Sequence, residues 1–167
     1  MNARRCVAPP DRLARTAGLL AVLLPTVAAA ALAQERIITL GGEVTEIVYA
    51  LGANDRIVGA DTTSVYPAAA LTTPRVGYVR RLSAEGVLSL EPDLILASGA
   101  IGPDTAVDQL EAAGVRFVRL PRDYTIGGIH DKVDAIAAVP GREQAGDALN
   151  RRIATRWAEA RARIAEL

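Results

Sequence analysis

Tyr78 lies between a glycine and a pair of arginines, Arg80 and Arg81, and this spacing suggests metal chemistry. A phenol keeps its proton at neutral pH and is then a poor metal ligand, but a guanidinium a few ångström away favours the phenolate. A phenolate binds hard Fe(III), and tyrosinate is an axial ligand of haem iron in some proteins. The alternative is a turn tyrosine beside solvated arginines. Taken alone, the stretch 76–86 favours that alternative, because structural ion pairs also perturb ionisation.

The chain must also supply elements that position such a tyrosine. It has 167 residues, of which 50% are hydrophobic and 4% aromatic, and this is enough for one domain with a hydrophobic core. The formal net charge is zero, so the composition does not indicate a nucleic-acid partner.

Residues 1–33 have the pattern of a secretory signal peptide. Four arginines accompany an apolar run from Ala17 to Ala30, and Ala31-Leu32-Ala33 has the small residues of a cleavage site. The alternative is a membrane anchor. However, Pro25 interrupts the run, which is shorter than the ~20 residues that span a bilayer.

Cleavage after Ala33 would leave a chain with a net charge of −3 and without Cys6, the only cysteine. Cys6 precedes the apolar run, so it is not placed as a lipidation cysteine. A chain without cysteine has no disulfide and is indifferent to oxidising conditions, which suits an export compartment. We therefore predict a periplasmic protein that is exported by a cleaved signal peptide.

Short strands and helices alternate through the remaining sequence. Apolar and β-branched runs bounded by glycine or polar residues predict strands, and apolar residues at helical spacing predict helices. The predicted strands are 36–40, 57–59, 93–98 and 115–120, and the predicted helices are 43–51, 84–88, 105–113, 125–138 and 142–167. The strand–helix–strand order predicts a three-layer α/β lobe with a mainly parallel sheet of four or five strands.

Two turns at strand ends are candidate ligand contacts. The loop 99–103 follows a strand at its carboxyl end, where ligands bind in open α/β sheets. Gly41-Gly42 precedes a helix and could hold a phosphate. Its spacing matches no phosphate-binding motif, and Glu43 would repel an anion, so we interpret these glycines as residues of a tight turn.

The pattern from 142 to 167 is the longest helical pattern in the chain, and Gly146 is the residue that weakens it. Such a helix would be close to ~40 Å long and could extend beyond a small domain. Its apolar stripe consists of Ala145, Leu149, Ile153, Trp157, Ala160 and Ile164. The pattern still continues at the last residue without a cap, which we interpret as a truncation.

Several stretches together resemble the periplasmic haem-binding proteins of bacterial haem ABC importers, which are built from two lobes joined by one long helix. The combination of Gly-Tyr-x-Arg at 77–80 with Leu-Ser-Ala-Glu-Gly at 82–86 carries the resemblance to haem binders. The matching stretches are 36–52, 61–67, 76–80, 82–93, 108–110 and 113–115. The strand–helix pattern by itself fits cobalamin and siderophore binders equally well.

The resemblance implies roles for three residues. Tyr78 would be the axial ligand to haem iron, and Arg80 would pair with the phenolate or with a haem propionate. Glu85 occupies the place of a carboxylate that docks onto arginines of the permease. A helix-dipole role at the helix start would explain Glu85 equally well.

Other aromatic and basic residues are weaker candidates. Tyr66 precedes a proline in a loop that could line the cleft, and it is the second-choice ligand. We interpret His130 as a solvated helical histidine. We interpret Tyr49 as a core residue and Trp157 as a packing residue. Tyr124 could reach the cleft from a strand end. Apolar loop residues expected against the porphyrin are Val65, Val79 and Ile101.

The resemblance thus predicts a binding lobe at 34–140, a linking helix at 141–167 and no second lobe. The expected function is extracytoplasmic capture of haem, as Fe(III) protoporphyrin IX, and its delivery to an ABC permease by a monomeric protein without a catalytic step. Half a cleft would leave one haem face in water. Two alternatives are a siderophore or cobalamin binder on the same scaffold, and an exported α/β enzyme. The sequence contains no G-x-S-x-G motif that would favour the enzyme.

Overall fold

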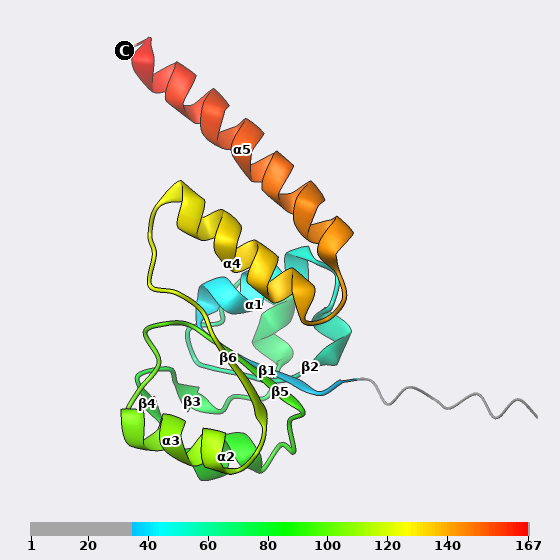
Figure 1. Ribbon diagram of the computed structural model, residues 1–167, viewed down its shortest axis with the longest axis vertical. Helices are drawn as coiled ribbons and strands as arrows, with labels where there is room; N and C mark the ends of the chain where they lie inside the picture. Colours follow the sequence, from blue (N-terminus) through cyan, green and yellow to red (C-terminus); the bar gives the residue numbers. More distant parts are fainter. Residues whose placement is uncertain (1–34, 167) are drawn as a thin grey trace, which may run out of the picture. The chain divides into compact units, whose positions relative to one another are not determined.

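The computed structural model describes residues 35–166, so the predicted signal peptide lies outside the described residues. Four parallel strands form one sheet in the order β2-β1-β5-β6 (Figure 1). These strands are β1 (Ile37–Leu40), β2 (Ile57–Ala60), β5 (Leu94–Ala97) and β6 (Arg116–Arg119). The predicted parallel sheet is confirmed, and β6 forms one edge of it.

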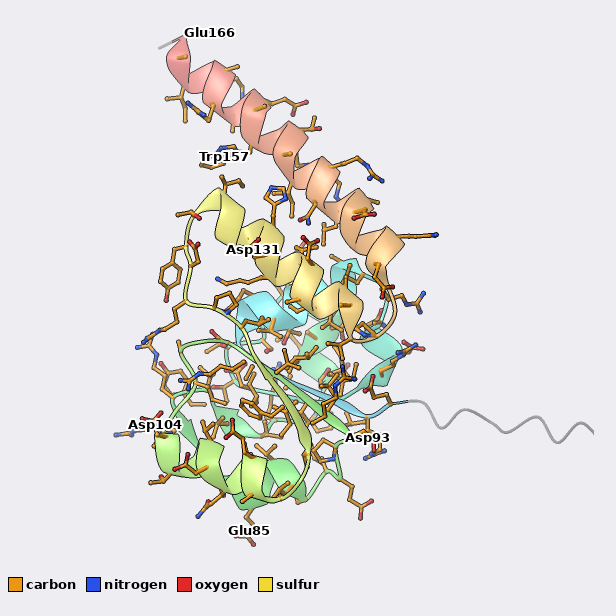
Figure 2. All side chains as sticks on the ribbon, viewed as in Figure 1. Glu85, Asp93, Asp104, Asp131, Trp157 and Glu166 are labelled. Carbon is orange, nitrogen blue, oxygen red and sulfur yellow. The ribbon has the colours of Figure 1, made fainter. Side chains whose placement is uncertain are left out.

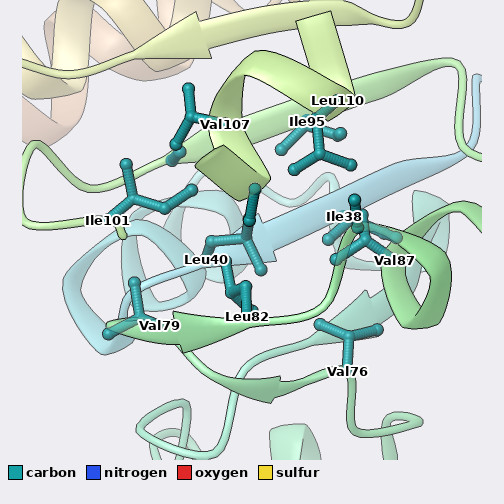
Figure 3. Packing of buried hydrophobic residues seen from close by; sticks show 13 residues of the cluster. Ile38, Leu40, Val76, Val79, Leu82, Val87, Ile95, Ile101, Val107 and Leu110 are labelled. Atoms are coloured by element: carbon teal, nitrogen blue, oxygen red, sulfur yellow. The ribbon is translucent and has the colours of Figure 1, made fainter. Parts of the chain in front are cut away.

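Side chains of the central strand β1 alternate between two hydrophobic clusters, one on each face of the sheet. Ile38 and Leu40 pack with α2 (Ala84–Leu88) and α3 (Asp104–Ala112), as Figure 3 shows. Ile37 packs on the other face with α1 (Gly42–Ala50) and α4 (Ile126–Ala138). This alternation follows from the strand pleat, and a parallel sheet needs helices on both faces. The three-layer architecture is therefore confirmed.

A small antiparallel hairpin lies beside the main sheet and carries the Gly-Tyr-x-Arg motif. It consists of β3 (Gly77–Tyr78) and β4 (Arg81–Leu82), with Tyr78 paired to Arg81. Gly77 accepts a hydrogen bond from Thr62 N at 2.8 Å, which ties β3 to the loop after β2. Gly102 N donates to Val79 O at 3.0 Å, which ties the hairpin to the loop after β5. The hairpin is thus fixed by its neighbours on both sides.

The long helix α5 (Glu143–Ala165) follows α4 and confirms the predicted C-terminal helix. Its first turns pack against α4, and Leu149 belongs to the same hydrophobic cluster as Ile136. The outer half of its apolar stripe is uncovered: Trp157 is 50% exposed and Ile164 is 69% exposed. Figure 2 shows Trp157 on this outer half. Trp157, which the sequence analysis expected to pack, is therefore half covered and half exposed within the described residues.

Gly146 has a packing reason that the sequence did not reveal. A Cβ atom at this position would lie 2.7 Å from Cβ of Ala137 on α4, so only glycine permits this helix approach. None of the helices within residues 35–166 is long and apolar enough to cross a membrane.

The remaining elements are two 3-10 turns, Asn54–Arg56 and Ala68–Thr72.

Candidate functional site

Loops at the carboxyl ends of the parallel strands surround a cavity of about 440 Å³, which we call the edge cavity. Gly41 follows β1, Thr63 follows β2 and Ser98 follows β5 at this edge. Tyr78 and Arg80 of the hairpin complete one side of it. This is the position at which open α/β sheets bind ligands, and the volume is typical of small-molecule sites.

A buried carboxylate keeps these loops in place. Asp61 is fully buried and accepts hydrogen bonds from Gly41 N at 2.9 Å, Thr63 N at 3.0 Å, Thr63 Oγ1 at 2.7 Å and Ser64 Oγ at 2.9 Å. Ser64 Oγ also lies 2.6 Å from the hydroxyl oxygen of Thr45 on α1. The network therefore joins the loop after β1 to the loop after β2.

The sequence analysis did not single out this buried carboxylate. The signal was present: an aspartate followed at once by hydroxyl residues is typical of a side chain that binds its own backbone. Gly42 also serves this close contact, because an added Cβ would lie 2.8 Å from Thr63 O. Gly41 has a φ of 124° and starts α1, which agrees with the interpretation of these glycines as a tight turn.

Tyr78 and Arg80 line the same cavity, whereas Arg81 does not. The Tyr78 side chain is 41% exposed, so its phenol is accessible at the cavity. Arg80 is exposed as well and lies at the turn between the two short strands. The structure thus brings together the two residues of the Gly-Tyr-x-Arg motif.

Val79 lines the edge cavity as expected, although it is 6% exposed and also packs into the hydrophobic cluster that holds Leu82 (Figure 3). Ile101 is 4% exposed, belongs to the same cluster and does not line the edge cavity. Val65, the third apolar residue expected to contact a porphyrin, is 60% exposed.

A second cavity of about 750 Å³ lies between α1, α4 and α5, and we call it the helix cavity. Tyr66 lines this cavity together with Tyr49, whereas Tyr78 lines the edge cavity. Tyr49 is half-buried at the cavity wall and is not the core residue that was expected. Tyr124 is 80% exposed and lines the edge cavity with Tyr78, as the sequence analysis allowed.

Glu43, Ile129 and Lys132 form a wall that the two cavities share. Glu43 Oε1 accepts a hydrogen bond from Ser98 Oγ at 2.6 Å. Lys132 Nζ donates to Asp123 O at 2.7 Å and lies 5.3 Å from the centre of the Tyr124 ring. The sequence analysis did not single out Lys132, since nothing in the pattern of α4 distinguishes it from a surface lysine.

Among the described residues, Asp123 is the one whose pKa is clearly shifted. The hydrogen bond from Thr125 N, at 2.8 Å, is the main cause that lowers the pKa of the Asp123 carboxyl below its ordinary value, and the charge of Lys132 adds to it. Thr125 also caps α4, because its hydroxyl accepts from Gly128 N. The carboxylate therefore stays ionised at the rim of the edge cavity.

His130 and Glu85 lie away from both cavities. His130 is partly buried on α4, and its carbonyl oxygen accepts a hydrogen bond from Asn150 of α5. Glu85 is exposed in the first turn of α2, whose predicted cap, Ser83, accepts from Gly86 N. In Figure 2, Glu85 projects into solvent at the end of the lobe opposite α5.

Comparison with known proteins identifies the family. The sequence profile described as "Periplasmic binding protein" matches residues 37–167. The chain belongs to the periplasmic binding protein family. It is a family of substrate-binding proteins and not of enzymes. The similar proteins include periplasmic binding proteins and a substrate-binding lipoprotein of an ABC transporter.

Three similar proteins illustrate the range of this family. An uncharacterized ABC transporter substrate-binding lipoprotein, YvrC of Bacillus subtilis (strain 168), is 32% identical over 117 residues, which cover 69% of this chain and 37% of YvrC. A vitamin B12-binding protein of Yersinia pestis (strain Pestoides F) is 38% identical over 103 residues, which cover 62% of this chain and 36% of that protein. The solved structure of the periplasmic heme-binding protein BhuT, in complex with two hemes, has 42% identity and a TM-score of 0.77, with coverage of 79% of this chain and 51% of BhuT.

Haem-binding proteins recur among the other similar structures, together with a vitamin B12 binding protein. The chain spans little more than a third of the curated relatives and about half of BhuT. This partial coverage fits an N-terminal lobe followed by its linking helix.

Proposed function

We propose that this protein captures haem outside the cytoplasm and takes part in its delivery to an ABC permease. The observation that carries the proposal is the accessible phenol of Tyr78 beside Arg80 at a cavity on the carboxyl edge of the sheet. The haem-binding proteins among the similar structures support it further. Haem is the cargo, so no bond needs to be made or broken in it.

In this proposal Tyr78 is the axial ligand of the haem iron. A phenolate oxygen suits hard Fe(III), and the guanidinium of Arg80 lines the same cavity. Arg80 could alternatively pair with a propionate of the bound haem. Exposed Val65 and Tyr66 lie on the neighbouring loop and would extend the contact surface, with Tyr66 on the side of the helix cavity.

A hemin titration followed by absorbance tests the proposal. We expect a high-spin ferric tyrosinate spectrum in the purified chain, and we expect Tyr78→Phe to abolish it because Phe has no oxygen ligand. Tyr66→Phe is the matched control and should keep the spectrum, since Tyr66 lines the other cavity. A correctly folded chain without any hemin spectrum would contradict the proposal.

Binding of a corrin is the second candidate, because vitamin B12-binding proteins are among the relatives at 38% identity. A siderophore would be the third cargo that suits the same scaffold. Neither cargo needs a tyrosinate ligand. Tight binding of cobalamin that survives Tyr78→Phe, measured by calorimetry, would favour this candidate over haem.

Export and docking complete the proposal. Residues 1–33 act as a cleaved signal peptide, residues 34–140 form the binding lobe, and residues 141–167 form the linking helix. Glu85 docks onto the permease from the exposed surface of α2. Glu85→Lys should leave hemin binding unchanged and lower uptake through the permease, which a transport assay in reconstituted vesicles would measure.

A further inference from the structure

Lys132 is a buried cation that forms no ion pair within 4.0 Å among residues 35–166. It is the only lysine of the chain, and its side chain is 8% exposed. Within the described residues, the ion pair that is found joins Arg116 to Glu35. No carboxylate oxygen of these residues lies within 4.0 Å of Lys132 Nζ. A buried ammonium is costly unless it is paired, and the Asp123 carboxylate acts on Lys132 only from beyond this distance, so an anion that enters the cavity could pair with it more closely.

The two acidic residues that line the edge cavity already accept hydrogen bonds from other donors. Glu43 accepts the hydroxyl hydrogen of Ser98, and Asp123 accepts the backbone N–H of Thr125. Lys132 Nζ uses one of its three donors on the carbonyl oxygen of Asp123. Two N–H groups therefore remain for an acceptor that enters the cavity.

The position of Lys132 shows which acceptor could reach it. It lines the edge cavity, whose other side is formed by Tyr78 and Arg80, and it also lines the helix cavity. A flat ligand held at Tyr78 would therefore face Lys132 across the same cavity. Haem carries two propionate carboxylates, whereas the corresponding side chains of the vitamin B12 corrin are neutral amides.

We propose that Lys132 receives a carboxylate of the bound tetrapyrrole and so favours tetrapyrroles with acid side chains over those with amides or esters. This inference rests on the proposed function, because it takes a tetrapyrrole as the ligand. Lys132 acts as a specificity residue and does not touch the iron.

The first test compares hemin with hemin dimethyl ester, which keeps the iron and the ring but has no free carboxylate. Lys132→Met should weaken hemin binding by about tenfold to a hundredfold, the usual effect of losing a charged hydrogen bond, and leave ester binding unchanged. Lys132→Arg should restore much of the preference for hemin over hemin dimethyl ester. Arg151→Met is the matched control, because Arg151 is an exposed cation that lines neither cavity.

The second test uses the single lysine as a spectroscopic label. A chain labelled with ¹⁵N and ¹³C lysine gives one side-chain signal. Metal-free protoporphyrin IX needs no axial ligand and should shift the Lys132 signal, also in the Tyr78→Phe variant. Its dimethyl ester should not shift the signal.

The outcomes separate the two proposals. If the tyrosinate spectrum is missing but protoporphyrin IX shifts the Lys132 signal, the role of Tyr78 is overturned. The role of Lys132 as a carboxylate-binding residue is then supported. If the tyrosinate spectrum is normal and Lys132→Met lowers the affinity for hemin and for its dimethyl ester equally, or lowers neither, only the role of Lys132 is overturned. A Lys132 signal that does not shift when protoporphyrin IX is added also overturns the role of Lys132. Thermal unfolding of each variant shows that the fold is retained.

Discussion

Asp61 shows how much of the binding edge depends on one buried side chain. Its two carboxylate oxygens accept four hydrogen bonds, and the donors belong to the loops after β1 and β2. Asn at this position would place an amide NH₂ against donors that need an acceptor. Such a change leaves buried polar groups unsatisfied, and that costs more than an ordinary hydrogen bond contributes.

We therefore expect Asp61→Asn to lower the free energy of unfolding by about 2–4 kcal/mol. Asp108→Asn is the control, since Asp108 is exposed on α3 and should change stability by less than about 0.5 kcal/mol. Urea denaturation followed by circular dichroism measures both. Equal stabilities of the two variants would mean that the network does not hold the edge.

Asp123 gives a prediction for pH dependence. Its pKa lies below the ordinary value of 3.8, mainly because of the hydrogen bond from Thr125 N. A carboxyl with a lowered folded-state pKa contributes stability that is present above the unfolded-state value and is lost as the pH falls through the folded-state value. The contribution should therefore be complete at neutral pH and disappear in strong acid.

Asp123→Asn cannot ionise, so the stability difference between wild type and variant should shrink as the pH falls below 3.8. Chemical denaturation of both proteins at a series of pH values measures this difference. A difference that stays constant through this range would show that the ionised form makes no contribution.

At the scale of elements, the contact between α4 and α5 depends on Gly146. The Cβ of an alanine would lie 2.7 Å from Cβ of Ala137, which belongs to the neighbouring helix and cannot move away easily. Gly146→Ala should destabilise the chain by about 1–3 kcal/mol through this overlap, although alanine favours helix formation. The measured quantity is the free energy of unfolding in urea.

Gly86→Ala provides the matched control within α2. The nearest atom to its added Cβ would be Ser83 Cβ at 3.8 Å, which is an ordinary contact. This variant should gain up to about 1 kcal/mol from helix propensity. A gain of the same size in Gly146→Ala would contradict the close approach of the two helices.

Elements that local sequence determines were predictable from the sequence. The strands and the long helices follow from apolar periodicity, and the caps at Ser83 and Thr125 follow from residue type. The hairpin at 77–82 was not predictable as strands. Its two-residue strands are held by bonds to Thr62 and Gly102, which lie elsewhere in the sequence.

The candidate site was predictable in part for the same reason. Tyr78 and Arg80 share a local motif, and the structure brings them to one cavity. Ile101 lies in the hydrophobic core and not at the cavity, which depends on how the loop after β5 packs on the lobe, so residue type alone misplaced it. Lys132 enters the site through the packing of α4 beside α1, which no local pattern encodes.

At the scale of the whole molecule, stability is distributed unequally between the lobe and the outer half of α5. Ile136 is fully buried under the sheet, whereas Trp157 is 50% exposed. Ile136→Ala should cost about 2–5 kcal/mol, while Trp157→Ala should cost less than about 0.5 kcal/mol. Thermal and urea unfolding compare the two. A large loss in Trp157→Ala would show that this helix half is covered in solution.

The pairing of β1 between β2 and β5 also has a consequence for the time course of synthesis. Ile37 of β1 pairs with Leu94 of β5, which is translated 57 residues later. Until then, β1 lacks one of its two neighbouring strands. At a translation rate of about 5–20 residues per second, that interval lasts roughly 3–11 seconds. During it, the fully buried side chains of β1 have no complete sheet to enter. A nascent chain that stops before residue 94 should remain unfolded, and it should be a good client for holding chaperones.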